Sequence, residues 1–370
     1  HGVELLDVYL GPSGVLTGSA RLAQEAKDQA EEAPPTQRDV QRQQTEAQAK
    51  RKALDAQFDF SEIVGEHPDL LKVLSTVGRV AGTRAPVLIL GESGTGKELI
   101  ADAIHRNSPR AGKAAVKINM GAITSTLFES EMFGHVRGSF TDAKVDRKGH
   151  VASAHGSTLF LDEIGELNRA DQVKLLRVLQ EKEFERLGSN KVQKCDVRLI
   201  AATNRKLDEE IEKGKFRSDL YYRLNVLPIY IPPLRDRQED IPLLVQVFIE
   251  QFNRKSGKNI QSISKATLDK LMNYHWPGNV RELENIIERA HVLSTGSKLD
   301  IGNWFKPASD IQSSQDELLS MDDNEKAHIL RVIKLTRWKI RGENGAAEIL
   351  KINPSTLESR MKKLGIERPV

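Results

Sequence analysis

Cysteine is almost absent from this sequence, since Cys195 is the only one in 370 residues. A single cysteine excludes a disulfide framework and is typical of a reducing compartment, so we expect a cytoplasmic protein. Long hydrophobic runs are also missing. No apolar stretch approaches the roughly eighteen residues that span a bilayer, and no signal peptide is visible, so we expect no membrane partner.

A strong net charge is missing as well. The 55 basic residues face 52 acidic ones, and the formal charge of +3 says nothing about nucleic acid. The nine histidines are scattered, and the closest pair, His150 and His155, has no cysteine or acidic cluster beside it. We therefore expect no dedicated metal-binding cluster. The length leaves room for two or three domains with a substantial core.

What the sequence does contain is a glycine-rich stretch between two apolar patterns. Residues Val87–Leu90 are typical of a buried strand, and Leu99–His105 have the apolar spacing of a helix. Glycines allow backbone angles at which several N–H groups can converge on phosphate oxygens, and Lys97 adds a charge for the β- and γ-phosphates. A flexible surface loop is the alternative, but the flanking strand and helix favour ATP binding by Gly91, Glu92, Ser93, Gly94, Thr95, Gly96, Lys97 and Glu98.

Two later predicted strands end in polar residues. The run Thr158–Leu161 leads to Asp162 and Glu163, about seventy residues after the glycine-rich stretch. A strand end in an open parallel sheet faces the ligand crevice. Asp162 is therefore predicted to hold Mg²⁺ through water and Glu163 to polarise the attacking water, although a solvated rim would also accept carboxylates. The next strand leads to Thr203 and Asn204, which could sense the γ-phosphate or simply begin a turn.

The overall pattern predicts an α/β fold with a parallel sheet covered by helices on both faces. Helical patterns separate five apolar runs, at Val87–Leu90, Ala115–Ile118, Thr158–Leu161, Val197–Ala201 and Leu227–Ile231. From Asp240 to about Ala290 only helical periodicity remains. We expect an N-terminal segment and helical linker over 1–57, an α/β ATPase subdomain over 58–235, a helical lid over 236–305, a linker over 306–321 and a helix-turn-helix domain over 322–370.

The N-terminal segment is harder to interpret. Val3–Leu10 is typical of a strand, and a polar helix is predicted from Gln37 to Gln57. Within that helix Val40, Ala47 and Leu54 stand seven apart. This spacing fits a coiled-coil linker and a solvated single helix equally well.

The C-terminal residues carry the local charge that the whole-chain value conceals. Residues 331–370 hold ten basic and four acidic side chains, a net of +6. Gly345–Leu350 and Ser355–Leu364 are predicted helices joined by a tight turn, with Asn353 as a helix cap. A helix-turn-helix is expected to bind DNA through Ser355, Thr356, Ser359, Arg360, Lys362 and Lys363. A basic helical bundle without DNA is the alternative.

Together these segments resemble an AAA+ ATPase of the bacterial enhancer-binding protein family, the activators of sigma-54 RNA polymerase. The match runs from about Phe58 to Phe305 and resumes in the C-terminal helices, which resemble a factor-for-inversion-type (Fis-type) helix-turn-helix. Glu98, unusual for a general phosphate loop, is what this family usually carries. The motifs that carry the resemblance are Gly91–Glu98, Glu131–His135, Gly138–Ala143, Leu159–Glu166, Phe216–Leu224 and Trp276–Leu283.

The resemblance implies further roles. Arg217 and Arg223 would act as arginine fingers on the ATP of a neighbouring subunit, which implies a ring, expected to be a hexamer; surface salt bridges are the alternative. Arg281 would contact phosphate from the lid. Asn119 would restrain Glu163 until ATP is read, although the following Met120-Gly121 departs from the usual Cys-Ala.

The loop Gly138–Ala143 would contact sigma-54 through Phe140 and Thr141, while Asp142 replaces the more usual Gly. The implied function is a transcription activator that uses ATP hydrolysis to remodel a sigma-54 promoter complex from enhancer DNA. The alternatives are another AAA+ machine, such as an unfoldase or DNA motor, and a DNA-binding regulator with an idle ATP site. The loop and the helix-turn-helix disfavour the first. The second is disfavoured by the presence of Lys97, Asp162, Glu163, Arg217 and Arg223.

Overall fold

The computed structural model describes residues 37–140, 143–302 and 305, and most of 325–366, where 327, 331, 334, 335, 337, 343 and 344 are excepted. The chain divides into two compact units, His1–Trp304 and Phe305–Val370. The predicted strand Val3–Leu10, the linker 306–321, Thr141 and Asp142 lie outside the described residues.

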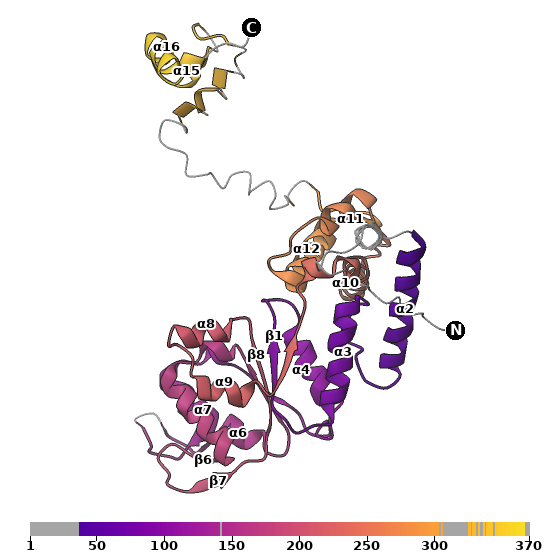
Figure 1. Cartoon of the computed structure of the whole chain (residues 1–370), viewed down its shortest axis with the longest axis vertical. Coiled ribbons are helices and arrows are strands. Elements are labelled where there is room, and N and C mark those ends of the chain that lie inside the picture. Colours follow the sequence, from indigo (N-terminus) through magenta and orange to yellow (C-terminus); the bar gives the residue numbers. More distant parts are fainter. Residues whose placement is uncertain are drawn as a thin grey trace, which may run out of the picture. The chain divides into compact units, whose positions relative to one another are not determined.

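A five-stranded parallel sheet, which includes the β1 and β8 labelled in Figure 1, forms the centre of the first unit. Its strand order is β2-β5-β8-β1-β9. Every neighbouring pair is parallel. The strands are β1 (Val87–Leu90), β2 (Val116–Asn119), β5 (Thr158–Asp162), β8 (Arg198–Thr203) and β9 (Leu227–Tyr230). All five predicted strands are therefore confirmed, with their ends shifted by at most two residues. Parallel pairing puts all their carboxyl ends at one edge, where the strand-end polar residues gather.

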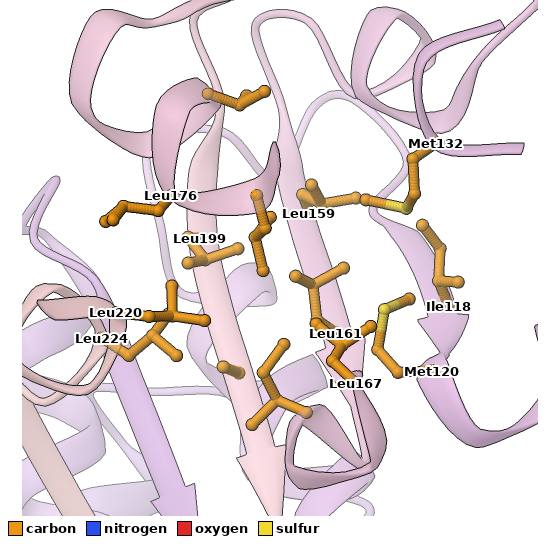
Figure 2. Close-up of a cluster of buried hydrophobic side chains, with 14 of the residues drawn as sticks. Ile118, Met120, Met132, Leu159, Leu161, Leu167, Leu176, Leu199, Leu220 and Leu224 are labelled. Atoms are coloured by element: carbon orange, nitrogen blue, oxygen red, sulfur yellow. The ribbon is translucent and has the colours of Figure 1, made fainter. Parts of the chain in front are cut away.

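The alternation of side chains along the strands divides the apolar core into two layers. Leu159, Leu161 and Leu199 point to one face, where they pack with Ile118, Met120, Met132, Leu220 and Leu224 (Figure 2). Phe160 and Ile200 point to the other face and pack with helices α3 (Pro68–Ala81) and α4 (Lys97–Arg106). Both faces of the sheet are thus covered, which explains why the central strands are continuous apolar runs.

Further helices, short strands and turns complete the part of the chain around the sheet. The helices of the first face are α5 (Ser125–Phe133), α6 (His150–Ser153), α7 (Arg169–Glu181), α8 (Leu207–Glu212) and α9 (Ser218–Leu224). Two antiparallel pairs, which the sequence did not predict, are β3 (Gly134–His135) with β4 (Arg147–Lys148) and β6 (Glu183–Glu185) with β7 (Val192–Lys194). Their strands are too short to leave a period in the sequence. Single 3₁₀ turns are η1 (Met120–Ala122), η2 (Ile164–Glu166), η3 (Leu234–Asp236) and η4 (Gln238–Asp240).

A helical lid follows the sheet, as predicted. It consists of α10 (Ile241–Ser256), α11 (Lys265–Met272) and α12 (Asn279–Leu293), with the short parallel pair β10 (Ser262–Ile263) and β11 (Lys298–Leu299). Trp276 is fully buried in the lid, and its indole N–H donates to the carbonyl of Leu271 at 2.9 Å. This anchor fixes the turn that leads into α12.

The predicted N-terminal helix is present as α2 (Gln37–Asp55). Its Ala47 and Leu54 are partly buried against the apolar layer of α3 and α4, together with Phe58. The side chain of Val40, the third residue of the seven-residue spacing, is not described. The spacing is therefore used within the chain, where α2 lies beside α3 (Figure 1), and not as a free solvated helix.

The described part of the second unit includes the helices α15 (Ala346–Ile349) and α16 (Pro354–Lys363). Lys351 in the turn between them has a positive φ of 51°, and the side-chain oxygen of Asn353 accepts from the N–H of Ser355 at 3.3 Å. Leu357 and Met361 of α16 are buried with Ile329, Val332, Ile333, Ala346, Ala347 and Ile366. The predicted cap and helix are both present, and Pro354 begins α16.

Candidate nucleotide-binding site

The glycine-rich stretch connects β1 to α4 as a tight loop. Gly94 and Gly96 have φ angles of +76° and +99°, which are strained for any residue with a Cβ. The Thr95 hydroxyl donates to the carbonyl of Glu92 at 2.8 Å. The Lys97 ammonium donates to the carbonyls of Gly91 at 2.9 Å and Glu92 at 2.8 Å, which holds its charge inside the loop.

A cavity of about 270 Å³ lies beside this loop. Its lining brings together nine of the predicted residues: Ser93, Gly94, Gly96, Lys97, Glu98, Asp162, Glu163, Asn204 and Arg281. The remaining lining residues are Leu99, Val280 and Glu284. A larger hollow of about 430 Å³ lies between α7 and the β6–β7 pair, but it contains neither the glycine-rich loop nor a carboxylate from the end of a central parallel strand. The smaller cavity is therefore the candidate nucleotide site.

The charges in this cavity influence one another. Burial lowers the pKa of Lys97, and the nearby Asp162 carboxylate opposes that change. Burial also raises the pKa of Asp162, although the N–H of Glu163 donates to its Oδ1 at 2.9 Å. Glu163 has a positive φ of 54°, unusual for a glutamate. This conformation turns the chain directly after β5, so two successive carboxylates both line the cavity.

Thr203 differs from the expectation. Its side chain is buried and is not part of the cavity lining; its hydroxyl accepts from the N–H of Arg205 at 3.1 Å. Its carbonyl accepts from the N–H of Gly91 at 3.4 Å. Thr203 thus supports the start of the phosphate-binding loop, while Asn204 faces the cavity.

Asn119 lies next to Asp162 in the sheet, because β2 and β5 pair with these two residues in register. Its side-chain oxygen accepts from the N–H groups of Gly121 at 2.8 Å and Ala122 at 3.2 Å, which caps η1. A Cβ added to Gly121 would lie 2.6 Å from Oε2 of Glu163. The carboxylate of Glu163 therefore rests against the backbone at Gly121, within reach of the turn that Asn119 holds.

Contacts between loop and lid were not predicted from the sequence. Arg235 donates to both oxygens of Glu92, at 2.5 and 2.8 Å. The fully buried Asn279 donates to Glu92 Oε2 at 3.1 Å and to the carbonyl of Ser93 at 3.0 Å, and its oxygen accepts from the N–H of Leu234 at 2.8 Å. The Arg235 hydrogen bonds hold the pKa of Glu92 below its usual range.

The start of α12 also contacts the loop directly. The N–H groups of Val280 and Arg281 donate to the carbonyl of Gly94 at 3.0 and 3.3 Å. A Cβ on Gly94 would collide with the carbonyl of Gly278, so glycine is needed there for space as well as for its φ angle. These backbone contacts explain how Arg281 of the lid reaches a cavity built by the sheet.

Glu98 is both a lining residue and an ion-pair partner. Lys117 donates to Glu98 Oε1 at 3.0 Å and to Asp102 Oδ2 at 2.7 Å. These hydrogen bonds and the two carboxylates raise the pKa of Lys117 against the opposing effect of burial. The carboxylate of Glu98 is thereby fixed at the rim of the cavity.

Arg217 and Arg223 are not among the residues that line the cavity of their own chain. Arg217 pairs with Asp219 at 2.6 Å, and Arg223 donates to the carbonyl of Leu179 at 3.1 Å. Both lie at the start and end of α9. The structure of one chain therefore brings Lys97, Asp162 and Glu163 together without these two arginines.

Phe140 lies on an exposed turn, with 39% of its surface accessible. The N–H of Gly138 donates to the carbonyl of Ala143 at 2.8 Å, which closes the base of the turn. The ring of His135 contacts the Phe140 ring edge-on, with centroids 5.0 Å apart. The exposed Phe140 ring is thus packed against the buried His135 ring.

The predicted DNA-contacting residues lie on one exposed face of α16. Ser355, Thr356, Ser359, Arg360, Lys362 and Lys363 are all exposed, while Leu357 and Met361 point into the core of the second unit. Arg360 pairs with Glu325 at 2.5 Å, and Arg341 pairs with Glu358 at 3.0 Å. Arg360, one of the predicted DNA-contacting residues, and the nearby Arg341 are therefore already paired with carboxylates.

A parallel sheet with this strand order, a phosphate-binding loop after β1 and a helical lid define an AAA+ ATPase module. Family comparison agrees: residues 63–230 match a Sigma-54 interaction domain, and residues 235–318 match an AAA+ ATPase lid domain. The chain belongs to the family of sigma-54-dependent transcriptional activators.

Individual relatives support this membership. The formate hydrogenlyase transcriptional activator FhlA of Escherichia coli (strain K12) is 50% identical over 312 residues, which cover 84% of this chain and 45% of that protein. The nitrogen fixation protein AnfA of Azotobacter vinelandii is 46% identical over 330 residues, covering 88% of this chain and 61% of AnfA. The chain thus spans about half the length of these relatives.

A solved structure is also similar. NtrX from Brucella abortus in complex with ADP aligns with a TM-score of 0.64 and 32% identity, over 94% of this chain and 73% of that one. The predicted family and fold class are therefore confirmed. Among the described residues, no helix is long and apolar enough to cross a membrane, and no group of three or more His, Cys, Asp or Glu could hold a metal ion.

Proposed function

We propose that this chain hydrolyses ATP and uses the energy to remodel a sigma-54 RNA polymerase closed complex while bound to enhancer DNA. The observation that carries the ATPase part is the convergence of Lys97, Asp162 and Glu163 on one cavity beside the glycine-rich loop. Membership of the sigma-54 activator family supports the remodelling part. Another AAA+ machine would need the same cavity but not the exposed Phe140 turn.

The roles of the cavity residues follow from their charges. Lys97 and the backbone N–H groups of the loop bind the β- and γ-phosphates, and Arg281 contacts phosphate from the lid. Glu163 orients and polarises the attacking water, and Asn204 responds to the γ-phosphate. Asn119 restrains Glu163 from the neighbouring strand through the η1 turn.

The donor set fits Mg²⁺ bound together with ATP. Asp162 is a hard oxygen donor at the strand end, and the described residues form no cage of three or more carboxylates around it. Mg²⁺ usually keeps several waters and takes one or two carboxylates plus substrate phosphates, so Asp162 would hold it through water. When bound, the ion neutralises charge that develops on the phosphates.

Arg217 and Arg223 act on the ATP of a neighbouring subunit. They lie at α9, away from the cavity of their own chain, while charge on the transferred phosphoryl group needs a guanidinium close by. Head-to-tail contacts of this kind close into rings. We expect a hexamer.

The other partners are assigned to two surfaces. Phe140 and Thr141 contact sigma-54, with Asp142 beside the contact, because an unpaired buried carboxylate would be strongly unfavourable. The exposed face of α16 enters the major groove of enhancer DNA. The whole protein works in the cytoplasm.

Hydrolysis is tested with Glu163→Gln. We expect ATP hydrolysis to fall by about 10²–10⁴-fold, because the attacking water loses its base, while the Kd for ADP stays within about twofold, because the phosphate-binding loop and Lys97 are untouched. Glu166→Gln is the matched control, since Glu166 lies three residues on and pairs with Arg205 outside the cavity. Equal turnover in Glu163→Gln and the parent would refute the assignment.

Coupling to sigma-54 is tested with Thr141→Ala, measured as open-complex formation at a sigma-54 promoter. We expect activation to be lost while basal ATP hydrolysis is retained, because the described residues of the loop, 138–140 and 143, are not among those that line the cavity. Asp142→Gly is the matched neighbour and should change activation only modestly. Full activation by Thr141→Ala would move an unfoldase or DNA motor ahead of the activator.

A further inference from the structure

Besides the apolar contacts of Ala47 and Leu54, helix α2 contacts the ATPase unit through one largely buried cation. It lies entirely before residue 63, where the family match begins. The side chain of Arg51 is only 12% exposed. Its guanidinium donates to the carbonyls of Phe60 at 3.1 Å, Ile63 at 2.8 Å and Gly65 at 3.0 Å. Its Nε donates to Asp55, at 2.9 Å for the shorter contact.

The opposite side of the same segment is held by an anion. The N–H groups of Glu66 and His67 donate to Oδ1 of Asp240 at 2.7 and 3.0 Å. Gly65 has a φ of +141°, and a Cβ there would lie 2.5 Å from Asp240 Oδ2. Residues 60–67, which we name the 60–67 loop, are therefore fixed between Arg51 of α2 and the residue that precedes α10 of the lid.

Asp240 is connected in turn to the phosphate-binding loop. Arg237 lies 3.9 Å from Asp240 Oδ2, and its Nη2 donates to the carbonyl of Thr95 at 3.3 Å. Both side chains are almost completely buried, and Asp240 Oδ2 and Arg237 Nε have no hydrogen-bond partner. Charges buried with incomplete compensation are sensitive to small displacements of their neighbours.

We propose that α2 sets the nucleotide affinity of the site, with Arg51 as the positioning residue. Arg51 holds the 60–67 loop against Asp240, and Arg237 relays that position to the carbonyl of Thr95. Any change in the preceding segment that rotates or withdraws α2 removes Arg51 from three carbonyls and loosens the phosphate-binding loop. The inference rests on the proposed ATP site and adds α2 as an element that controls the nucleotide affinity of that site.

The first test compares two arginines of the same helix in the full chain. Arg51→Ala should raise the Kd for a fluorescent ADP analogue, and the KM for ATP, by about tenfold, a usual size for coupling between two sites. Its kcat should change much less, because Glu163 and Asp162 are not displaced. Arg42→Ala is the control: Arg42 also forms an i,i+4 pair, with Glu46 at 2.9 Å, but that side chain is 80% exposed. It should leave both constants within about twofold.

Two conservative variants separate the loop contacts from helix stability. Arg51→Lys keeps the charge but lacks the planar guanidinium that reaches three carbonyls. Its Kd for ADP should therefore lie between those of the parent and Arg51→Ala. Asp55→Asn removes the helix pair and leaves the carbonyl contacts, so it should behave as the parent. If Arg51→Ala and Arg51→Lys both bind ADP with the parent Kd, the inference is wrong. A parent chain that binds no ADP contradicts the proposed function instead.

The second test needs no substitution. Coupling is reciprocal, so ADP must stabilise the contacts of α2 as much as α2 stabilises ADP. Hydrogen exchange of the parent should slow at residues 51–67 when ADP is added. Unchanged exchange at 51–67, with slowed exchange at 91–98, would overturn the inference while leaving the ATP site intact.

Discussion

Two ion pairs of this molecule have the same closest distance and similar exposure, but they differ in the residues that support them. Glu92–Arg235 in the first unit and Glu325–Arg360 in the second both have a closest distance of 2.5 Å. Their side chains are 41% and 39% exposed in the first pair, and 33% and 51% in the second. Such exposure alone would make each worth no more than about 1 kcal/mol.

The pairs differ in their surroundings. Glu92 also accepts from Asn279, a fully buried residue that joins the phosphate-binding loop to the lid. Arg360 lies on the exposed face of α16, where other anions can compete with Glu325 for its guanidinium. The same chemistry therefore fixes a junction in one unit and lies on the proposed DNA-contacting face in the other. Three substitutions sharpen this contrast.

The largest effect is expected from Asn279→Ala, which removes the buried support. The Leu234 N–H and the Ser93 carbonyl lose this partner, and Glu92 Oε2 keeps only its hydrogen bond from Arg235. We expect a loss of about 2–4 kcal/mol in unfolding free energy, with weaker ADP binding, measured by calorimetric melting and titration.

Backbone strain must be separated from these hydrogen bonds. Asn279 has a φ of +52°, which alanine tolerates poorly, so Asn279→Gly should recover about 1 kcal/mol relative to Asn279→Ala. Asn273→Ala serves as the matched control, because its amide bonds locally to the carbonyl of Asp269. If Asn273→Ala and Asn279→Ala melt at the same temperature, Asn279 does not give the Glu92–Arg235 pair the buried support that we assign to it.

The junction also marks the boundary of what the sequence could predict. The strands, the phosphate-binding loop and the strand-end Asp162 and Glu163 are local patterns, and each was found where it was expected. Glu92 and Asn279 are 187 residues apart, and no local period records their contact. The sequence spacing of α2 was visible, but Ala47 and Leu54 fitted several partners equally well. Only the fold selects the contact with α3.

A middle-sized effect is expected from Glu92→Gln, and it should depend on pH. The pKa of Glu92 is lowered from 4.5 in the folded chain, mainly by Arg235. Ionised Glu92 therefore stabilises the fold above the unfolded-state value, and this contribution is lost as pH falls through the folded-state pKa. Because both side chains are about two-fifths exposed, we expect about 1 kcal/mol or less.

The measurement is the difference in melting temperature between Glu92→Gln and the parent across pH. The difference should be present at neutral pH and shrink below the ordinary glutamate value of 4.5. Glu46→Gln, which removes an exposed pair within α2, is the control and should show little difference at any pH. A difference for Glu92→Gln that grows toward acid pH would have the wrong sign for this assignment.

The smallest effect on stability is expected from Glu325→Gln in the second unit. Its pair with Arg360 has no buried support comparable to Asn279, so melting should shift by less than about 1 kcal/mol. DNA binding should instead become tighter by a few fold, because a released guanidinium can neutralise a phosphate or contact a base edge.

Arg360→Ala should weaken specific binding and reduce the salt slope by about one ion. Glu358→Gln, which releases Arg341 and not Arg360, is the control for added charge alone. Titrations of enhancer DNA at several salt concentrations separate these cases. If Glu325→Gln destabilises the unit and leaves the DNA affinity unchanged, the pair is structural and resembles Glu92–Arg235 after all.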